Sequence, residues 1–376
     1  MKNLKLCEIC DVRDGTHDSP SYYSEGYPFI TTKNLVNGSI DFSTASLICE
    51  KDYQHFDKRS HVDDGDILMP MIGTIGGAVR VKKDRDFAIK NVALIKKKNE
   101  NIDFDFLLNV LNSNRMKSFF EQYKTGGTQK FISLTFIRNL PIPDISLEEQ
   151  KEIATNLKKI QSAIDNKKQQ LSLLDEAVKS EFVEMFGNPI DNDKSFPKKR
   201  MTDVCPIQEA KLQIVSDSVW LLNLDMIEQD TGTILDKQFV SMDEVGNSTI
   251  QFSSDHVLYS KLRPYLNKVA LPDEAGYASS ELVPFLPKRE MNKIYFAYLL
   301  RSDSFVELIN SKSGGAKMPR ASMDFIRKFE IPVPPLSLQK QFAAFVQQID
   351  KSKFVVKQQI ADLQELLDSK MQEYFG

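Results

Sequence analysis

The stretch IPDISLEEQKEI at residues 142–153 recurs as IPVPPLSLQKQF at residues 331–342. Both belong to a longer repeat, in which residues 136–187 align without a gap with residues 325–376 at a constant offset of 189 residues. Of the 52 aligned positions, 19 are identical, whereas the residues that precede each copy match only faintly. A unit that occurs twice is no solenoid, which needs at least three stacked repeats. The sequence therefore predicts a covalent pseudo-dimer, in which a duplicated scaffold carries two different heads.

Each repeated stretch is predicted to open a long helix. Ser146 and Glu149 form a capping box, and the prolines before them keep the preceding chain extended. At the far end, Gly187 supplies a left-handed stop, and Pro189 prevents continuation. Each helix then spans about 40 residues, or roughly 60 Å.

Apolar residues recur along both helices at the alternating spacing of a heptad seam. The predicted seam residues are Ile153, Leu157, Ile160, Ile164, Leu171, Leu174 and Val178 in the first helix, and Phe342, Val346, Ile349, Val356, Ile360, Leu363 and Leu367 in the second. Lys167, Glu181, Lys353 and Lys370 interrupt the seam. Because the pattern is sustained over about five heptads in both copies, it favours a two-helix coiled coil.

The chain between the helices sets their direction. Residues 188–199 form a polar linker of 12 residues, which reaches at most about 42 Å and cannot run back along the first helix. We therefore expect an antiparallel coil with a head at each end. The predicted domains are a first head at residues 1–145, a first helix at 146–187, a second head at 188–335 and a second helix at 336–376.

Both heads carry the same order of signals, which predicts strand-rich α/β (α+β) domains. The expected strands include residues 27–30, 66–69 and 78–81 in the first head and 219–222, 256–259 and 267–270 in the second. A helix follows in each head, at residues 104–123 and 294–310, and then a glycine loop at 126–130 and 314–318. Cys7 and Cys10 have the spacing of a zinc-binding pair, but no second pair exists to complete four ligands. Cys10 aligns with Cys205, which suggests matched core strands instead.

Composition limits the class of protein. The chain of 376 residues has 41% hydrophobic residues and a net charge of −3, which argues mildly against a nucleic-acid-binding protein. If the protein holds DNA, we expect basic partners to supply much of the neutralisation of the phosphates. No apolar run approaches a membrane span and no secretion signal is recognisable, so we expect a cytoplasmic protein.

We find no catalytic motif in the sequence. It contains no phosphate-binding loop, and its one Asn-Pro pair, Asn188-Pro189, lacks the flanking residues of an amino-methyltransferase. A nuclease-like arrangement of Asp144, Glu149 and Lys151 loses both carboxylates in the second copy. The four histidines show no ligand spacing, so we expect neither a cofactor nor a metal.

The order of these features resembles the specificity subunit of type I DNA restriction–modification systems, over essentially the whole chain. The resemblance rests on the two-fold repeat, on Gly-Asp-Ile-Leu at residues 65–68, on Gly-Gly-Thr-Gln at 126–129, and on the entry to each long helix. The second head departs from it, with Asp-His-Val-Leu at residues 255–258 and Gly-Gly-Ala-Lys at 314–317.

The resemblance implies a non-catalytic subunit of a DNA methyltransferase and endonuclease complex. Each head would be a target-recognition domain that reads one half of an asymmetric, bipartite sequence in double-stranded DNA. The coil would set the gap between the halves and dock two methylation subunits, and motor–nuclease subunits would join for cleavage.

Loop residues with amide, guanidinium, hydroxyl or ammonium groups are the candidates for DNA contact, because these groups bind base edges or phosphates. They are Lys33, Asn34, Arg80, Lys90, Asn91, Thr128, Gln129 and Lys130 in the first head, and Asn223, Lys261, Arg263, Tyr265, Ser280, Lys317 and Arg320 in the second.

Two other hypotheses for the function of the chain stay open. The chain could be the recognition part of a methyltransferase–nuclease enzyme whose catalysis lies elsewhere, but the missing methyltransferase motifs count against this. It could instead be a coiled-coil adaptor that does not touch DNA, which the near-neutral charge permits. Two diverged heads count against an adaptor, which has little use for two different tips.

Overall fold

The computed structural model describes residues 2–72, 77–123, 131–211, 218–315 and 317–376, and the chain folds into two compact units. Unit one holds residues 1–168 and 358–376, and unit two holds residues 169–357. The division falls inside two long helices, α6 (Leu147–Phe186) and α11 (Leu336–Phe375), each of 40 residues. Each unit therefore combines one head with a segment of both helices.

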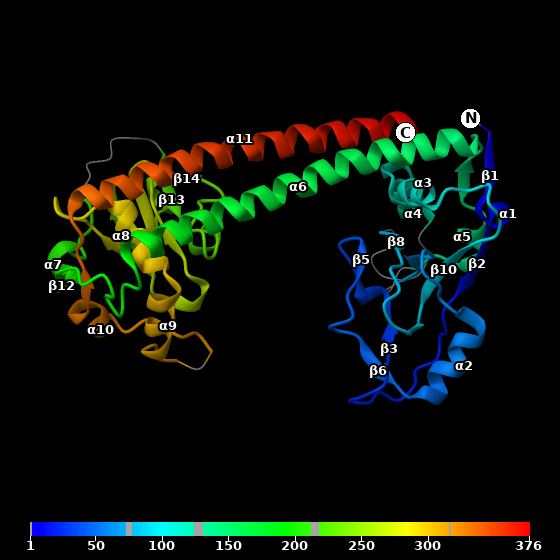
Figure 1. Ribbon diagram of the computed structural model, residues 1–376, viewed down its shortest axis with the longest axis horizontal. Coiled ribbons are helices and arrows are strands. Elements are labelled where there is room, and N and C mark those ends of the chain that lie inside the picture. The colour runs from blue at the N-terminus through cyan, green and yellow to red at the C-terminus, as the bar shows by residue number, and fades with distance from the viewer. Residues whose placement is uncertain (1, 73–76, 124–130, 212–217, 316) are drawn as a thin grey trace. The chain divides into compact units, whose positions relative to one another are not determined.

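The two long helices pack antiparallel in each unit. In unit one, Leu157 near the start of α6 shares a core with Leu367 and Phe375 near the end of α11. In unit two, Val178 near the end of α6 shares a core with Phe342 near the start of α11 (Figure 1). None of the predicted seam residues is exposed, so the predicted antiparallel pair is confirmed. The buried ones are Leu157, Ile164, Val178, Phe342, Val346 and Val356, and the half-buried ones are Ile153, Ile160, Leu171, Leu174, Ile349, Ile360, Leu363 and Leu367.

Head one is built on a sheet in the order β2-β10-β7-β8, whose neighbours are antiparallel. Its two central strands are apolar runs buried on both faces, as expected for strands inside a core. A second sheet has the order β6-β3-β9, in which β3 and β9 are parallel. The strands are β1 (Asn3–Lys5), β2 (Cys10–Asp14), β3 (Tyr27–Ile30), β4 (Leu35–Val36), β5 (Ser39–Ile40), β6 (Ser46–Ile48), β7 (Ile67–Pro70), β8 (Val79–Arg80), β9 (Ala88–Ile89), β10 (Val92–Lys97) and β11 (Pro141–Pro143). The helices are α1 (Leu6–Ile9), α2 (Glu50–Ser60), α3 (Phe104–Asn112), α4 (Asn114–Tyr123) and α5 (Leu134–Arg138).

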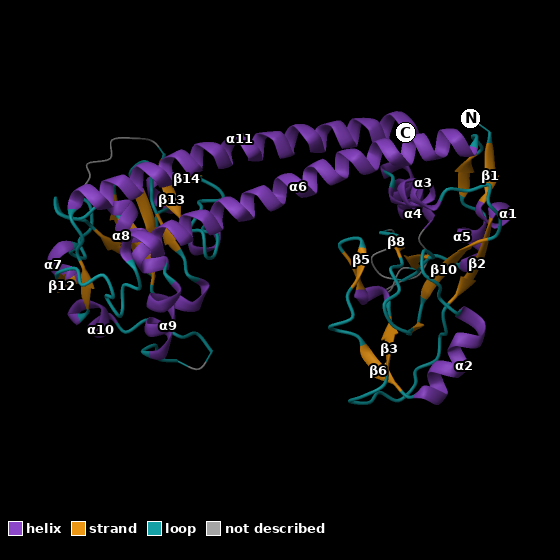
Figure 2. Cartoon of the chain, in the orientation of Figure 1, coloured by secondary structure: helices purple, strands orange, loops and turns teal. Residues whose placement is uncertain are grey.

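Head two, whose strands are orange in Figure 2, repeats most of these pairings, with an isolated bridge between Ile207 and Phe285 in place of the pair of β2 and β10. Its sheets have the orders β17-β16-β19 and β14-β13-β18-β15, and β13 and β18 are again parallel. As β1 pairs with β11 in head one, β12 pairs with β20 in head two. The strands are β12 (Lys198–Arg200), β13 (Val219–Leu222), β14 (Gln238–Val240), β15 (Thr249–Phe252), β16 (Val257–Ser260), β17 (Val269–Ala270), β18 (Gly276–Ser279), β19 (Leu282–Phe285) and β20 (Glu330–Pro332). The helices are α7 (Met201–Val204), α8 (Lys293–Arg301), α9 (Asp303–Ser311) and α10 (Met323–Lys328).

Three sequence expectations need correction. The single helix predicted in each head is two helices. The break falls at Ser113 and Ser302, which adopt extended backbone and cap the C-terminus of the first helix. Their hydroxyls donate to the carbonyls of Val110 and Leu299, both at 2.7 Å. Helix α2 had no predicted counterpart. Cys205 is buried as expected but follows α7 and is not in a strand, whereas Cys10 opens β2.

A buried glutamine ties the start of α6 to head one. Gln150 Oε1 accepts a hydrogen bond from the backbone N–H of Asp103 at 2.9 Å. Its Nε2 donates to the carbonyls of Asn101 at 3.3 Å and Ile145 at 3.1 Å. Because the Asp103 side chain also caps α3, this glutamine fixes that helix against α6.

Gln339 makes the same three bonds in unit two. Its Oε1 accepts from the N–H of Asn292 at 2.8 Å, and its Nε2 donates to the carbonyls of Glu290 at 3.1 Å and Pro334 at 2.8 Å. Asn292 caps α8 as Asp103 caps α3. The glutamine that is identical in both copies of the repeat is therefore the joint between helix and head.

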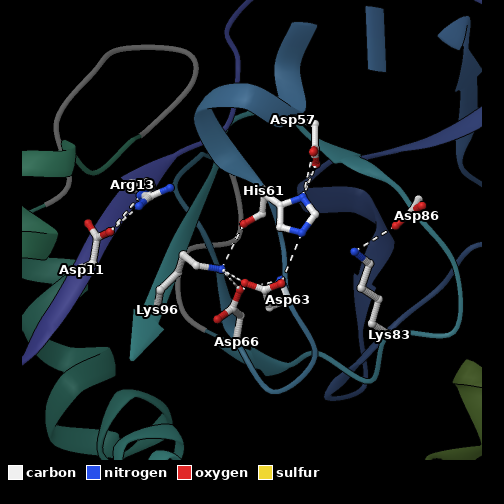
Figure 3. A network of polar contacts seen from close by, with 9 residues as sticks. All are labelled: Asp11, Arg13, Asp57, His61, Asp63, Asp66, Lys83, Asp86 and Lys96. Carbon is white, nitrogen blue, oxygen red and sulfur yellow. Dashed lines mark hydrogen bonds and ion pairs between the residues drawn. The ribbon is translucent and has the colours of Figure 1, made fainter. Parts of the chain in front are cut away.

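A charged network fixes the turn that leads into β7 (Figure 3). Asp66, which is buried, accepts a hydrogen bond from the Asp63 N–H at 2.7 Å. Lys96 Nζ lies 2.6 Å from Asp66 and 2.7 Å from Asp63, and its hydrogen bond lowers the pKa of Asp63. Gly65 takes a positive φ of 82°, which favours glycine. The Gly-Asp-Ile-Leu motif is thus a turn followed by a core strand.

His256 replaces Asp66 in head two and performs the same task. Its Nδ1 lies 3.0 Å from the backbone nitrogen of Ser253 and accepts its hydrogen, so Nε2 donates to the carbonyl of Gln208 at 2.9 Å. The strand pairing puts Leu286 where head one has Lys96. A neutral imidazole needs no cation, whereas the buried carboxylate of Asp66 does.

Replacing Gln339 with leucine should lower the free energy of unfolding of unit two by about 2–4 kcal/mol, because one N–H and two carbonyls lose their buried partner. Urea unfolding followed by circular dichroism measures this. The control is Gln347→Leu, at an exposed position of the same helix, which should shift stability by less than about 0.5 kcal/mol. Equal effects of the two substitutions would show that the glutamine is not the joint.

A second prediction concerns the turn of head two. The change His256→Asp should destabilise unit two by about 1–3 kcal/mol, because the new carboxylate is buried without a cation. Adding Leu286→Lys should recover part of this loss by recreating the ion pair of head one, although Leu286→Lys alone should not stabilise. A double-mutant cycle of unfolding free energies is the measurement, and a coupling energy of zero would contradict the equivalence.

Candidate nucleic-acid interface

Three loop segments meet at one place in each head. In head one, the Met71 N–H donates to the carbonyl of Asn91 at 3.4 Å, and the Ile132 N–H donates to the carbonyl of Met71 at 2.9 Å. Ile72 also pairs with Phe131. These contacts join the exit of β7, the turn between β9 and β10, and the chain before α5. We call residues 71–72, 90–91 and 131–132 the head-one junction.

The same contacts recur in head two. The Lys261 N–H donates to the carbonyl of Glu281 at 3.0 Å, and the Ala321 N–H donates to the carbonyl of Lys261 at 2.8 Å. Leu262 pairs with Arg320 as Ile72 pairs with Phe131. Residues 261–262, 280–281 and 320–321 form the head-two junction. The backbone framework is thus repeated, and its side chains differ.

The head-two junction gathers three of the predicted DNA-binding residues, namely Lys261, Ser280 and Arg320. Lys261 Nζ donates to the carbonyl of Ser280 at 2.8 Å. Arg320 donates through Nε and Nη2 to the two oxygens of Glu281, at 3.3 and 2.9 Å. This contact lowers the pKa of Glu281 and raises that of Arg320, so both groups stay charged. Glu281 was not among the predicted residues.

Arg263 lies beside this junction, since its N–H donates to the carbonyl of Pro319 at 2.7 Å. Its φ of 48° places a residue other than glycine in the left-handed region, and Asn267 has the same φ. Such backbone is costly and clusters at functional sites. Among the described residues, Arg263 Nε is one of the few buried polar side-chain atoms that lack a hydrogen-bond partner.

The other three candidates of head two lie outside the junction as defined. Tyr265 belongs to the short 3-10 helix at Pro264–Leu266 and is 50% exposed. Lys317 is exposed in the loop before Arg320. Asn223 follows β13 at the start of another 3-10 helix, where its N–H contacts the sulfur of Met226 at 3.5 Å. Of the three, only Tyr265 and Lys317 belong to segments adjoining the junction.

The head-one junction contains Lys90 and Asn91. Asn91 has a φ of 55°, and its Oδ1 lies 2.7 Å from Nδ1 of His17. Lys90 Nζ donates to the Ser19 hydroxyl at 2.6 Å. Both side chains are half-buried, with polar atoms held by neighbouring loops.

The remaining head-one candidates lie elsewhere. Arg80 packs over the ring of Phe104 at 5.1 Å and pairs with Asp105 at 3.4 Å, so it serves the contact between β8 and α3. Lys33 is exposed in the 3-10 helix at Thr32–Asn34. Asn34 is buried and its amide bonds the surrounding loop, including the Thr31 N–H at 2.9 Å and the Asp41 carbonyl at 3.3 Å. We therefore leave Asn34 out of the interface. Thr128, Gln129 and Lys130 lie outside the described residues.

Within the described part of the chain, no three histidine, cysteine or acidic side chains are grouped so that they could hold a metal ion. Burial raises the pKa of the Cys10 thiol to about 12 and also raises that of Cys205. Both thiols therefore stay protonated and act as small core residues. Over the same residues, no helix is both long and apolar enough to cross a membrane.

Known proteins share this sequence pattern. The specificity subunit of the type I restriction enzyme MjaVIII from Methanocaldococcus jannaschii is 23% identical over 353 residues, which cover 86% of this chain and 79% of that protein. The specificity subunit of the type I restriction enzyme EcoDI from Escherichia coli is 26% identical over 123 residues, which cover 33% of this chain and 27% of that protein.

Solved structures share the fold. The S subunit of a type I restriction–modification system from M. genitalium superposes with a TM-score of 0.55 at 15% identity, covering 100% of this chain and 96% of that one. A chain from a study of complex assembly and conformational transition of the type I system gives a TM-score of 0.54 at 15% identity, with coverage of 100% and 97%.

The decisive match is to a family model. The model for the type I restriction modification DNA specificity domain matches residues 1–176 and 194–365, so it covers both heads and most of both long helices. Each of the two matched regions contains one copy of the internal repeat and one of the two equivalent junctions. This protein therefore belongs to the family of type I restriction–modification specificity subunits, which recognise DNA sequence.

Proposed function

We propose that each head reads one half of a bipartite, asymmetric DNA target through its junction and the loops beside it, without catalysis by this chain. The observation that carries the proposal is the repeated backbone framework with different side chains. Lys261, Glu281 and Arg320 stand in head two where Met71, Asn91 and Phe131 stand in head one. Base edges are read by such side chains, so two different junctions suit two different half-sites.

The helix pair then sets the gap between the half-sites. Each helix has 40 residues, which corresponds to roughly 60 Å. Successive major-groove faces recur about every 34–36 Å along DNA, so a rod of this length is commensurate with one or two turns of the duplex. The seam supports this role, because its apolar residues hold the pair together along both units.

Partners complete the complex. We propose that two methylation subunits dock on the repeated helical regions, one for each copy, and that motor–nuclease subunits join for cleavage. The net charge of −3 supports basic partners, because a duplex needs cations around its phosphates. A chain that transferred methyl groups from labelled S-adenosylmethionine to DNA without partners would contradict the non-catalytic role.

The change Arg263→Ala should weaken binding of the assembled complex to its target by roughly tenfold, because a guanidinium next to the junction is lost. Fluorescence anisotropy with a labelled duplex measures the affinity, and co-purification shows whether the partners still assemble. Arg289→Ala is the matched control, since Arg289 is an exposed arginine of the same head outside the junction. Unchanged affinity and unchanged methylation in the Arg263 variant would remove this residue from the interface.

If the helix pair sets the gap between the half-sites, lengthening both helices should widen that gap. Inserting seven helix-forming residues after Lys168 and seven after Lys357 lengthens both helices by about 10 Å and keeps the seam in phase. The half-sites should stay the same, and the preferred gap should grow by about three base pairs. Mapping of methylated adenines in cells reads the target directly.

A control with five residues inserted at both positions turns the seam by about 140° and should lose the complex. Retention of the original gap at full efficiency in the seven-residue variant would show that the helices do not set it.

A further inference from the structure

We propose that one pair of side chains at each junction reads a single base pair: Glu281 with Arg320 reads a C·G pair in head two, and Asn91 with Phe131 reads an A·T pair in head one. This inference rests on the proposed function. It goes beyond it by assigning a base pair to each head at one equivalent position. The equivalence comes from the backbone contacts. Glu281 makes in head two the contact that Asn91 makes in head one, and Arg320 makes the contact that Phe131 makes.

The chemistry of head two matches a C·G pair. In the major groove, cytosine presents the N4 amino donor, and guanine presents the O6 and N7 acceptors. Glu281 offers carboxylate oxygens and Arg320 offers guanidinium N–H groups, side by side with Nη2 2.9 Å from Oε1. The contact uses N–H groups on Nε and Nη2, which leaves those on Nη1 for guanine. Each carboxylate oxygen keeps a lone pair for cytosine.

The chemistry of head one matches an A·T pair. An asparagine amide bonds adenine at N6 and N7 together, and an apolar side chain contacts the thymine methyl group. Asn91 supplies the amide, and its φ of 55° and its contact with His17 at 2.7 Å hold it in the turn. Oδ1 has two lone pairs, so the histidine leaves one for the adenine amino group. Phe131 supplies the apolar surface and is 43% exposed.

Stability alone does not account for the head-two pair. The Arg320 side chain is 53% exposed and that of Glu281 is 24% exposed. Ion pairs with an exposed partner add little to the free energy of folding, because water screens the charges. The pair does fix the direction of both groups, and fixed direction is what base reading needs. The aligned ring of Phe131 cannot form an ion pair, so the framework itself does not require one.

The test is a transplant. The complex carrying Glu281→Asn and Arg320→Phe receives the pair of head one, and its target is determined by mapping methylated adenines and by selection of bound duplexes from a random pool. One C·G pair of the second half-site should become A·T, while the first half-site and the gap stay unchanged. The preference for the original C·G pair over A·T at that position should fall roughly tenfold or more.

Two further variants keep the test decisive if the transplant does not assemble. Glu281→Gln has nearly the same shape and should relax the choice of base at one position of the second half-site. The charge swap Glu281→Arg with Arg320→Glu keeps an ion pair but exchanges its donor and acceptor, so it should change that same position. A second half-site that is unchanged in both variants would overturn the inference and make the pair purely structural. Failure of the unaltered complex to select any bipartite sequence would instead overturn the proposed function.

Discussion

The buried glutamine at the start of each long helix is the constraint on which the rest of the structure depends. Gln150 and Gln339 each satisfy one N–H and two carbonyls inside the protein, and no other side chain has an acceptor and two donors at that reach. The bonds hold only at one position along the helix and one rotation about its axis. Each head is therefore fixed on its own helix. The other helix closes the same core from its far end, with Phe186 against Tyr295 in unit two and Phe375 against Phe106 in unit one.

With the framework fixed in this way, side chains are free to differ. The turn before the core strand uses an aspartate with a lysine in head one and a neutral histidine in head two, and both accept the same backbone N–H. The junctions follow the same rule, because the contacts that recur in both heads run through the backbone. A fold of this kind separates the groups that hold loops in place from the groups that face a ligand. That separation lets two heads of one architecture diverge in what they bind.

The sequence was sufficient for features set by local periodicity. The heptad spacing predicted both long helices and a seam whose predicted residues are all buried or half-buried, and short apolar runs predicted strands such as β3 and β13 at their observed bounds. It was insufficient where distant residues decide. Phe182 was missed because the heptad count placed its neighbour Glu181 in the seam, whereas the ring of Phe182 contacts both Tyr295 of the head and Phe342 of α11. Asn34 was proposed for DNA because amides suit base edges, but it is buried within its own loop. The contact of Glu281 with Arg320 was not predicted, because the two residues lie 39 residues apart in the chain. The alignment of Glu281 with Asn91 was the one signal that could have found this glutamate.

Charge pairing inside the chain bears on how a protein with a net charge of −3 can recognise DNA. Several cations of the heads are already bound to acids, among them Lys96 with Asp66, Lys237 with Asp273 and Arg320 with Glu281. A cation held in this way neutralises less phosphate charge than a free one, so non-specific attraction to DNA from this chain is small. A bound cation still donates its remaining N–H groups in a fixed direction, which serves sequence reading. Weak general attraction combined with directed base contacts raises the ratio of specific to non-specific binding. In the complex that we propose, affinity for the phosphate backbone comes mainly from the partners, and this chain contributes mainly the choice of sequence.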